Sequence, residues 1–143
     1  MNSSSKRFCK CLGLLVVAVL ASNAIAGNGP ERASLCEITN NIETYEGKLV
    51  RFDASAVAAL HEYDVALVDE TCKKRAMLLR ASSEFVEDSA FQSMLKQLYP
   101  GFPDNDGYTN AKVPISVVGK VLRVENRGLL MTYLELASIR LRR

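Results

Sequence analysis

The single histidine and its neighbours are the first side chains whose chemistry could serve a binding site. His61 is followed by Tyr63 and Asp64. An imidazole, a phenol and a carboxylate could contact a metal ion or a carbohydrate. Neighbouring side chains alternate between two sides of an extended segment, so these residues do not form a ready ligand set. The spacing favours a solvated loop, with ligand contact as the alternative.

A short basic run is the second candidate, and Lys74 and Arg75 belong to it. Arg80 follows a few positions later. Together with Tyr63, these cations could contact an anionic glycan or a nucleic acid. Single-strand binders also need several stacking aromatic residues, and the acidic pair at 69–70 offsets the positive charge. We therefore expect a solvated turn here, and we do not expect nucleic-acid binding.

The arginines at the end of the chain alternate with an apolar residue. Arg140 and Arg142 flank Leu141, and Arg143 is the last residue. This alternation is typical of the outward face of a final strand. So few charges give only a weak attraction to a membrane or a polyanion.

The first 26 residues have the three parts of a secretory signal. Lys6, Arg7 and Lys10 precede an uncharged apolar run over 12–21, and 24–26 (Ala-Ile-Ala) places small residues before Gly27. We expect cleavage there and a periplasmic or secreted protein without a stable membrane anchor. An uncleaved anchor is the alternative, although the apolar run is short for a membrane span.

Two cysteines remain once that leader is removed. They are Cys36 and Cys72, so only one intramolecular pairing exists. In an oxidising compartment we expect a disulfide. Closing a loop of about 37 residues would stabilise the fold by up to about 4 kcal/mol. A metal or redox pair is the alternative, which the absence of a C-x-x-C spacing disfavours.

Composition and charge exclude several classes of protein. Hydrophobic residues make up 48% of the chain and charged residues 24%, which is typical of a globular domain and excludes a disordered tail, a collagen repeat or a coiled coil. Removal of the leader reduces 18 basic residues to 15 against 16 acidic ones, so the net charge changes from +2 to −1. A broad positive field for nucleic-acid binding is therefore not expected.

Apolar periodicity predicts the elements that position these residues. A capping box from Ser34 to Glu37 begins a short helix after a flexible entry over 27–33. Period-two alternation predicts strands over 48–60, 65–68 and 75–80, with a turn at 40–47 before the first of them. The 61–64 segment and the 69–74 turn separate these strands.

A longer helix and two more strands complete the pattern. A second capping box, Ser89 to Gln92, begins a helix whose apolar positions (Phe91, Met94, Leu95 and Leu98) form one core-facing side. Strands follow over 113–124 and 129–141, joined by a turn in which Gly128 can adopt a positive φ. The inward-facing set of the last strand changes near 137–138, which predicts a bulge.

This order, three strands, a helix and two strands after a short N-terminal helix, is that of an OB-fold. We therefore expect a mostly β (α+β) chain over 27–143, folded as one five-stranded OB-like Greek-key barrel of order β-β-β-α-β-β. Gly119, inside the fourth strand, marks a place where a barrel strand bends sharply.

Four short motifs also resemble a family of small exported bacterial domains with an OB-like barrel. They are Leu35-Cys36-Glu37, the run 45–52 (Tyr-Glu-Gly-Lys-Leu-Val-Arg-Phe), Cys72 after the second strand, and 117–121 (Val-Val-Gly-Lys-Val). The resemblance spans most of the chain after the leader. It implies the fold and the cysteine pairing, and it transfers no catalytic residue.

No catalytic motif emerges, so we expect a non-catalytic binding or accessory module without a cofactor or metal. Its partner would be an envelope protein or a small anionic ligand. The predicted surface combines the 61–64 loop, the basic segment up to Arg80, and the turn that holds Arg127. The alternative is a small secreted hydrolase, nuclease-like or glycosidase-like, with carboxylates that the sequence does not identify. A structural subunit of an envelope assembly is a third interpretation.

Overall fold

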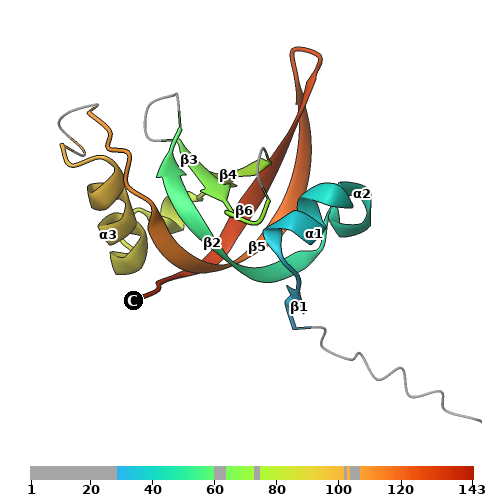
Figure 1. The fold of residues 1–143 in the computed structure, drawn as a ribbon, viewed down its shortest axis with the longest axis horizontal. Helices are drawn as coiled ribbons and strands as arrows, with labels where there is room; N and C mark the ends of the chain where they lie inside the picture. Colours follow the sequence, from blue (N-terminus) through green and yellow to red (C-terminus); the bar gives the residue numbers. More distant parts are fainter. Residues whose placement is uncertain (1–28, 60–63, 73–74, 102, 104–106) are drawn as a thin grey trace, which may run out of the picture.

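The computed structural model describes residues 29–59, 64–72, 75–101, 103 and 107–143 (Figure 1). The fold is mostly β, with one sheet of six strands and three helices in this part of the chain. The elements are β1 (Glu31–Arg32), α1 (Leu35–Asn40), α2 (Ile42–Tyr45), β2 (Leu49–Ala58), β3 (Val65–Val68), β4 (Ala76–Arg80), the 3₁₀ turn η1 (Ser83–Phe85), α3 (Ser89–Leu98), β5 (Val113–Asn126) and β6 (Leu129–Leu141).

Five of the six strands pair in a ring. β2 is antiparallel to β3 and β3 to β4; β4 is parallel to β6, which is antiparallel to β5, and β5 pairs back with β2. The sixth strand, β1, is parallel to β2 and pairs with its first residues. It lies on the same edge of β2 as β3, which pairs with the last residues of β2. The sheet curves strongly between α3 at one end and the α1–α2 pair at the other (Figure 1).

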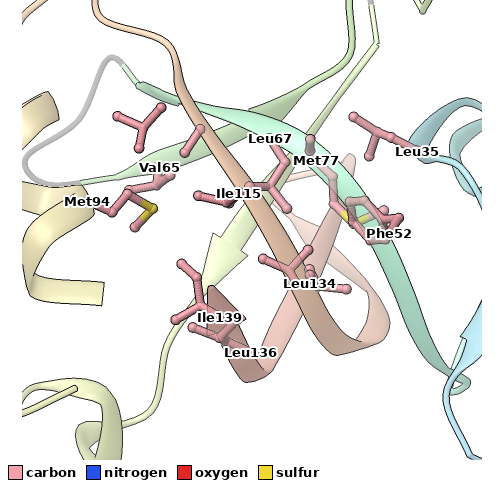
Figure 2. Packing of buried hydrophobic residues seen from close by; sticks show 14 of the residues in the cluster. Leu35, Phe52, Val65, Leu67, Met77, Met94, Ile115, Leu134, Leu136 and Ile139 are labelled. Atoms are coloured by element: carbon pink, nitrogen blue, oxygen red, sulfur yellow. The ribbon is translucent and has the colours of Figure 1, made fainter. Parts of the chain in front are cut away.

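The predicted alternation along β2 is confirmed. Val50, Phe52, Ala54 and Ala56 are buried, whereas Arg51 and Asp53 between them are exposed. The inward side chains of all five ring strands form one hydrophobic cluster, with Leu35 of α1 at one end and Met94 of α3 at the other (Figure 2). Outward positions on β2, β5 and β6 are therefore free to serve a binding surface.

The longer helix begins with a different cap from the predicted one. The side chain of Asp88 accepts a hydrogen bond from the Phe91 backbone N–H at 2.8 Å, so Asp88 is the N-cap and the Ser89–Gln92 capping box is wrong. Gln92 instead donates to the Val86 carbonyl at 2.5 Å. Aspartate is as good an N-cap as serine, and it lies one residue earlier.

The inward side of α3 is mostly as predicted. Met94, Leu95 and Leu98 are buried. Phe91 is only half-buried and packs edge-on against Phe85, with ring centroids 6.2 Å apart. It therefore lies at the border of the core. None of the helices in the described ranges is long and apolar enough to cross a membrane.

The N-terminal segment is more regular than predicted. Glu31–Arg32 forms β1 where a flexible entry was expected, and Ile42–Tyr45 forms α2 within the expected turn. The Ser34–Glu37 capping box is confirmed: the Ser34 N–H donates to Glu37 Oε2 at 2.7 Å, and the Glu37 N–H donates to Ser34 Oγ at 3.1 Å. Pairing with β2 orders the segment before α1, which local composition did not predict.

The predicted bulge in β6 is confirmed. Val118 is paired with Ser138 and Gly119 with Leu136, which leaves Ala137 as the extra residue. A Cβ atom on Gly119 would lie 2.5 Å from the Glu135 carbonyl oxygen. The glycine therefore lets β5 and β6 approach closely where the register shifts.

Candidate functional site

Strand register brings three arginines to one outer face of the sheet. Arg32 of β1 is paired with Arg51 of β2. Arg51 is also paired with Val118 of β5, and Val118 with Ser138 of β6. Two residues beyond Ser138, Arg140 completes the set. Because paired residues on adjacent strands lie on the same face, these side chains share one surface.

The arginines line a hollow of about 890 Å³, which we call the arginine hollow. Arg32, Arg51 and Arg140 supply its cations, and Glu37, Asp53 and Asp69 supply its carboxylates. Neutral lining comes from Pro30, Ala33, Ser34, Phe52, Ser116, Val117, Val118 and Ser138. Its volume lies within the range of small-molecule binding sites.

The Asp53 carboxylate at the centre of this face already has partners. The Ser116 hydroxyl donates a hydrogen bond to Oδ1. On the other side, Arg142 Nη1 lies 3.4 Å from Oδ2. Asp53 is therefore held by β5 and by the end of the chain, and it does not pair with Arg51 on its own strand.

The two carboxylates at the rim are also engaged. Glu37 caps α1, and the Ser34 backbone N–H and hydroxyl lower the pKa of Glu37 below its ordinary value. Asp69 accepts hydrogen bonds from the Thr71 backbone N–H at 2.8 Å and from the Thr71 hydroxyl at 2.7 Å. Both groups hold local backbone structure.

The three arginines of the hollow, by contrast, form no ion pair with any residue in the described part of the chain. Arg32 and Arg51 are also direct cross-strand neighbours, and like charges in that arrangement destabilise a sheet. A bound anion would remove this repulsion. The arrangement can therefore bind a carboxylate, phosphate or sulfate group through guanidinium N–H donors.

Three predicted site residues, His61, Tyr63 and Lys74, lie outside the described residues. Asp64, which closes the same loop, is exposed. Its backbone carbonyl accepts hydrogen bonds from the Tyr99 hydroxyl at 2.5 Å and from the Ala59 N–H at 2.8 Å. Burial raises the pKa of Tyr99. Its hydrogen bond to the Asp64 carbonyl joins β3 to the end of α3. Asp64 thus has a structural contact through its backbone.

The other predicted basic residues do not converge. Arg75 Nη1 donates to the Thr39 carbonyl of α1 at 2.6 Å. Arg80 ends β4 opposite Glu135 of β6. Arg127 lies in the β5–β6 turn with a φ of 51°, beside Gly128 at 78°. The turn is about 20 Å along β6 from Glu135, so Arg80 and Arg127 do not form the single surface that was predicted.

The two cysteines meet where α1 contacts the β3–β4 turn, and we call this group the cysteine corner (Cys36, Thr39, Thr71, Cys72 and Arg75). Cys36 Sγ lies 3.6 Å from Thr71 Oγ1, and Cys72 Sγ lies 3.8 Å from Thr39 Oγ1. The adjacent Cys72 thiol raises the pKa of Cys36. Both cysteines are free thiols in this structure, and their side chains interact with each other. The disulfide stays a prediction.

The sequence contains part of the signal for the arginine hollow. Alternation placed Arg51 and Asp53 outward on one strand and Arg140 outward on another. Their meeting depends on the β2–β5–β6 register, and the part played by Arg32 depends on β1, which was not predicted. No protein-family model matches the sequence, and a search of characterised proteins finds no match. The chemistry of the hollow therefore carries the functional argument.

Proposed function

We propose that this protein is an exported, non-catalytic binding module that takes a small anionic ligand in the arginine hollow. One observation carries the proposal. All three carboxylates of the hollow have partners, whereas Arg32, Arg51 and Arg140 have no ion-pair partner among the described residues. Unpaired guanidinium groups in a hollow of ligand size match carboxylate, phosphate and sulfate groups.

A binding role is favoured over hydrolysis by the state of these carboxylates. A general base needs a carboxylate that can approach substrate or water. Asp53 is held by Ser116 and Arg142, and Glu37 and Asp69 are engaged with the backbone of neighbouring residues. These contacts give each carboxylate a structural role, whereas the three arginines have no ion-pair partner among the described residues.

The finer architecture belongs to the same proposal. We assign the domain over 27–143 to an OB-like Greek-key barrel of the small exported bacterial type. The ring of strand pairings and the position of α3 between β4 and β5 in the chain support this assignment. The same proposal includes a removed signal peptide over 1–26 and a Cys36–Cys72 disulfide. The interaction between the two thiols supports that pairing.

Anion-dependent stability tests the proposal. The protein is expressed with its leader, purified in its processed form, and unfolded in urea with and without inorganic phosphate at constant ionic strength. At about 20 times its Kd, a bound anion raises the free energy of unfolding by about 1.8 kcal/mol. We expect this response in the wild type and in Arg80→Gln, and we expect Arg51→Gln to remove most of it.

Three results would contradict the proposal. If phosphate and sulfate leave the wild type unchanged, or Arg80→Gln removes the response while Arg51→Gln keeps it, the hollow is not the site. If nuclease, glycosidase or esterase substrates are turned over and Arg51→Gln abolishes turnover, the module is catalytic.

A further inference from the structure

The cations of the arginine hollow are divided between two places. Arg32 and Arg51 form a cross-strand pair at one end. Arg140 lies two strands away from Arg51 and two residues further along β6. This register separates the Cα atoms of Arg51 and Arg140 by about 12 Å. One compact anion therefore contacts the pair more easily than it contacts all three residues.

The paired end matches a doubly charged group. Arg32 and Arg51 together present two positive charges and up to ten N–H donors, since each guanidinium carries about five. A phosphate monoester or a sulfate group has enough acceptor oxygens to accept hydrogen bonds from both guanidinium groups at once. The single Arg140 at the other end matches a singly charged carboxylate through one bidentate contact.

The strip between the two ends favours hydroxyl groups over further negative charge. Asp53 and Ser116 share a hydrogen bond there, and Ser116 is paired with Arg140. Ser138 lies two residues before Arg140 on β6 and also lines the hollow. The Asp53 carboxylate, which is ion-paired with Arg142, can accept additional hydrogen bonds from hydroxyl groups, whereas an anionic group has no donor to offer it. Ser138 can donate to or accept from a hydroxyl. A ligand with a hydroxylated, uncharged middle suits this strip.

We infer that the ligand is a sugar-sized, hydroxyl-bearing molecule with a phosphate-like dianion at one end and a carboxylate at the other. The dianion binds Arg32 and Arg51, the hydroxyl groups lie over Asp53, Ser116 and Ser138, and the carboxylate binds Arg140. This inference rests on the proposed function and adds the chemical class of the ligand.

A graded set of probes tests it by calorimetry on the purified protein. The probes are inorganic phosphate, glucose 6-phosphate, gluconate and 6-phosphogluconate, which has a phosphate, a polyol and a carboxylate in that order. We expect 6-phosphogluconate to bind about tenfold more tightly than glucose 6-phosphate, because one more charge-assisted contact forms. Gluconate alone should bind more weakly than either.

Three variants locate each end of the ligand. Arg140→Gln should bring 6-phosphogluconate to within about twofold of glucose 6-phosphate, since only the former uses Arg140. Arg51→Gln should weaken the binding of 6-phosphogluconate and of glucose 6-phosphate by about tenfold or more. Arg127 is an exposed arginine outside the hollow, so Arg127→Gln is the matched control. It should change the affinity for neither sugar phosphate.

The outcomes separate this inference from the proposed function. If phosphate binds and Arg51→Gln weakens it, but 6-phosphogluconate gains nothing over glucose 6-phosphate, the two-ended ligand is wrong and the anion site stands. Equal weakening of both sugar phosphates by Arg140→Gln would also overturn the two-ended assignment. If none of the four probes binds, both proposals fail together.

Discussion

The cysteine corner and the arginine hollow both border α1, but they differ in whether their arginines have partners. In the corner, each thiol lies against a threonine hydroxyl, and Arg75 donates to the Thr39 carbonyl. In the hollow, the carboxylates are partnered, and Arg32, Arg51 and Arg140 form no ion pair within the described ranges.

Under the proposed function, this difference would separate side chains that hold the fold from side chains that bind a ligand. Arg123, in contrast, has ion-pair partners. Its Nη1 lies 3.7 Å from the Glu43 carboxylate on α2 and 3.5 Å from the Glu46 carboxylate just after α2. Arg51 has no such neighbour and instead faces Arg32. Local rules that are broken without compensation are typical of functional sites.

The largest expected effect lies in the cysteine corner. Oxidation of Cys36 and Cys72 by a small-molecule disulfide such as oxidised glutathione transfers two electrons and two protons to it and forms one S–S bond. The bond should raise the free energy of unfolding by up to about 4 kcal/mol, because it closes a loop in the unfolded chain and lowers the conformational entropy of that state. Urea unfolding of the oxidised and reduced wild type measures the change.

A Cys36→Ser, Cys72→Ser double variant is the control, and it should unfold like the reduced wild type. Phosphate binding to the folded double variant should change little, since the arginines remain in place. If the exported protein alkylates at both thiols without reduction, the disulfide is wrong. If loss of the bond abolishes phosphate binding in folded protein, the corner and the hollow do not have separate roles.

A smaller effect distinguishes the two kinds of arginine. Arg51→Gln removes a like-charge contact, so without added phosphate it should raise the free energy of unfolding by about 0.5 kcal/mol at low salt. High salt should remove this gain through screening. Arg123→Gln removes two ion pairs and should lower the free energy of unfolding by about 0.5 kcal/mol. Urea titrations at two salt concentrations measure both; a loss of stability in Arg51→Gln would mean that Arg51 holds the fold.

The smallest effect concerns the rim of the hollow. Because the Ser34 N–H and hydroxyl lower the folded-state pKa of Glu37 below its ordinary value of 4.5, the ionised carboxylate stabilises the fold. This contribution is fully present above the unfolded pKa and is lost as the pH falls through the folded pKa.

Glu37→Gln should therefore make stability less dependent on pH on the acid side. Glu87→Gln, an exposed carboxylate in the turn before α3, is the matched control. Thermal unfolding across acid pH measures the difference between the two variants. An unchanged acid profile in Glu37→Gln would show that the cap does not contribute to stability.

Much of the fold could be predicted, because apolar spacing is a local property. Alternation in β2, the bulge at Ala137 and the buried positions of α3 all follow from which residues recur on one side. The errors are local as well: Asp88 and Ser89 are adjacent competing caps, and β1 is too short to show any period.

The arginine hollow could not be predicted in the same way. Arg51 and Arg140 are 89 positions apart in the sequence, and nothing local indicates which strands are neighbours. The predicted surface combined Arg75 and Arg80, at the two ends of one predicted strand, with Arg127 in a turn distant in sequence. In the structure, Arg75 contacts α1, Arg80 ends β4 beside β6, and Arg127 lies in the β5–β6 turn.

By itself, the sequence determined the longer strands, the helices α1 and α3, and the buried face of most of these elements. These depend on residue type and short spacing. Tertiary structure alone decided that Arg32 and Arg51 are neighbours and that Arg140 shares their face. It also decided that the nearby carboxylates have other partners. The physical reason is that cross-strand register brings distant residues within reach of one ligand, and no single strand encodes that register.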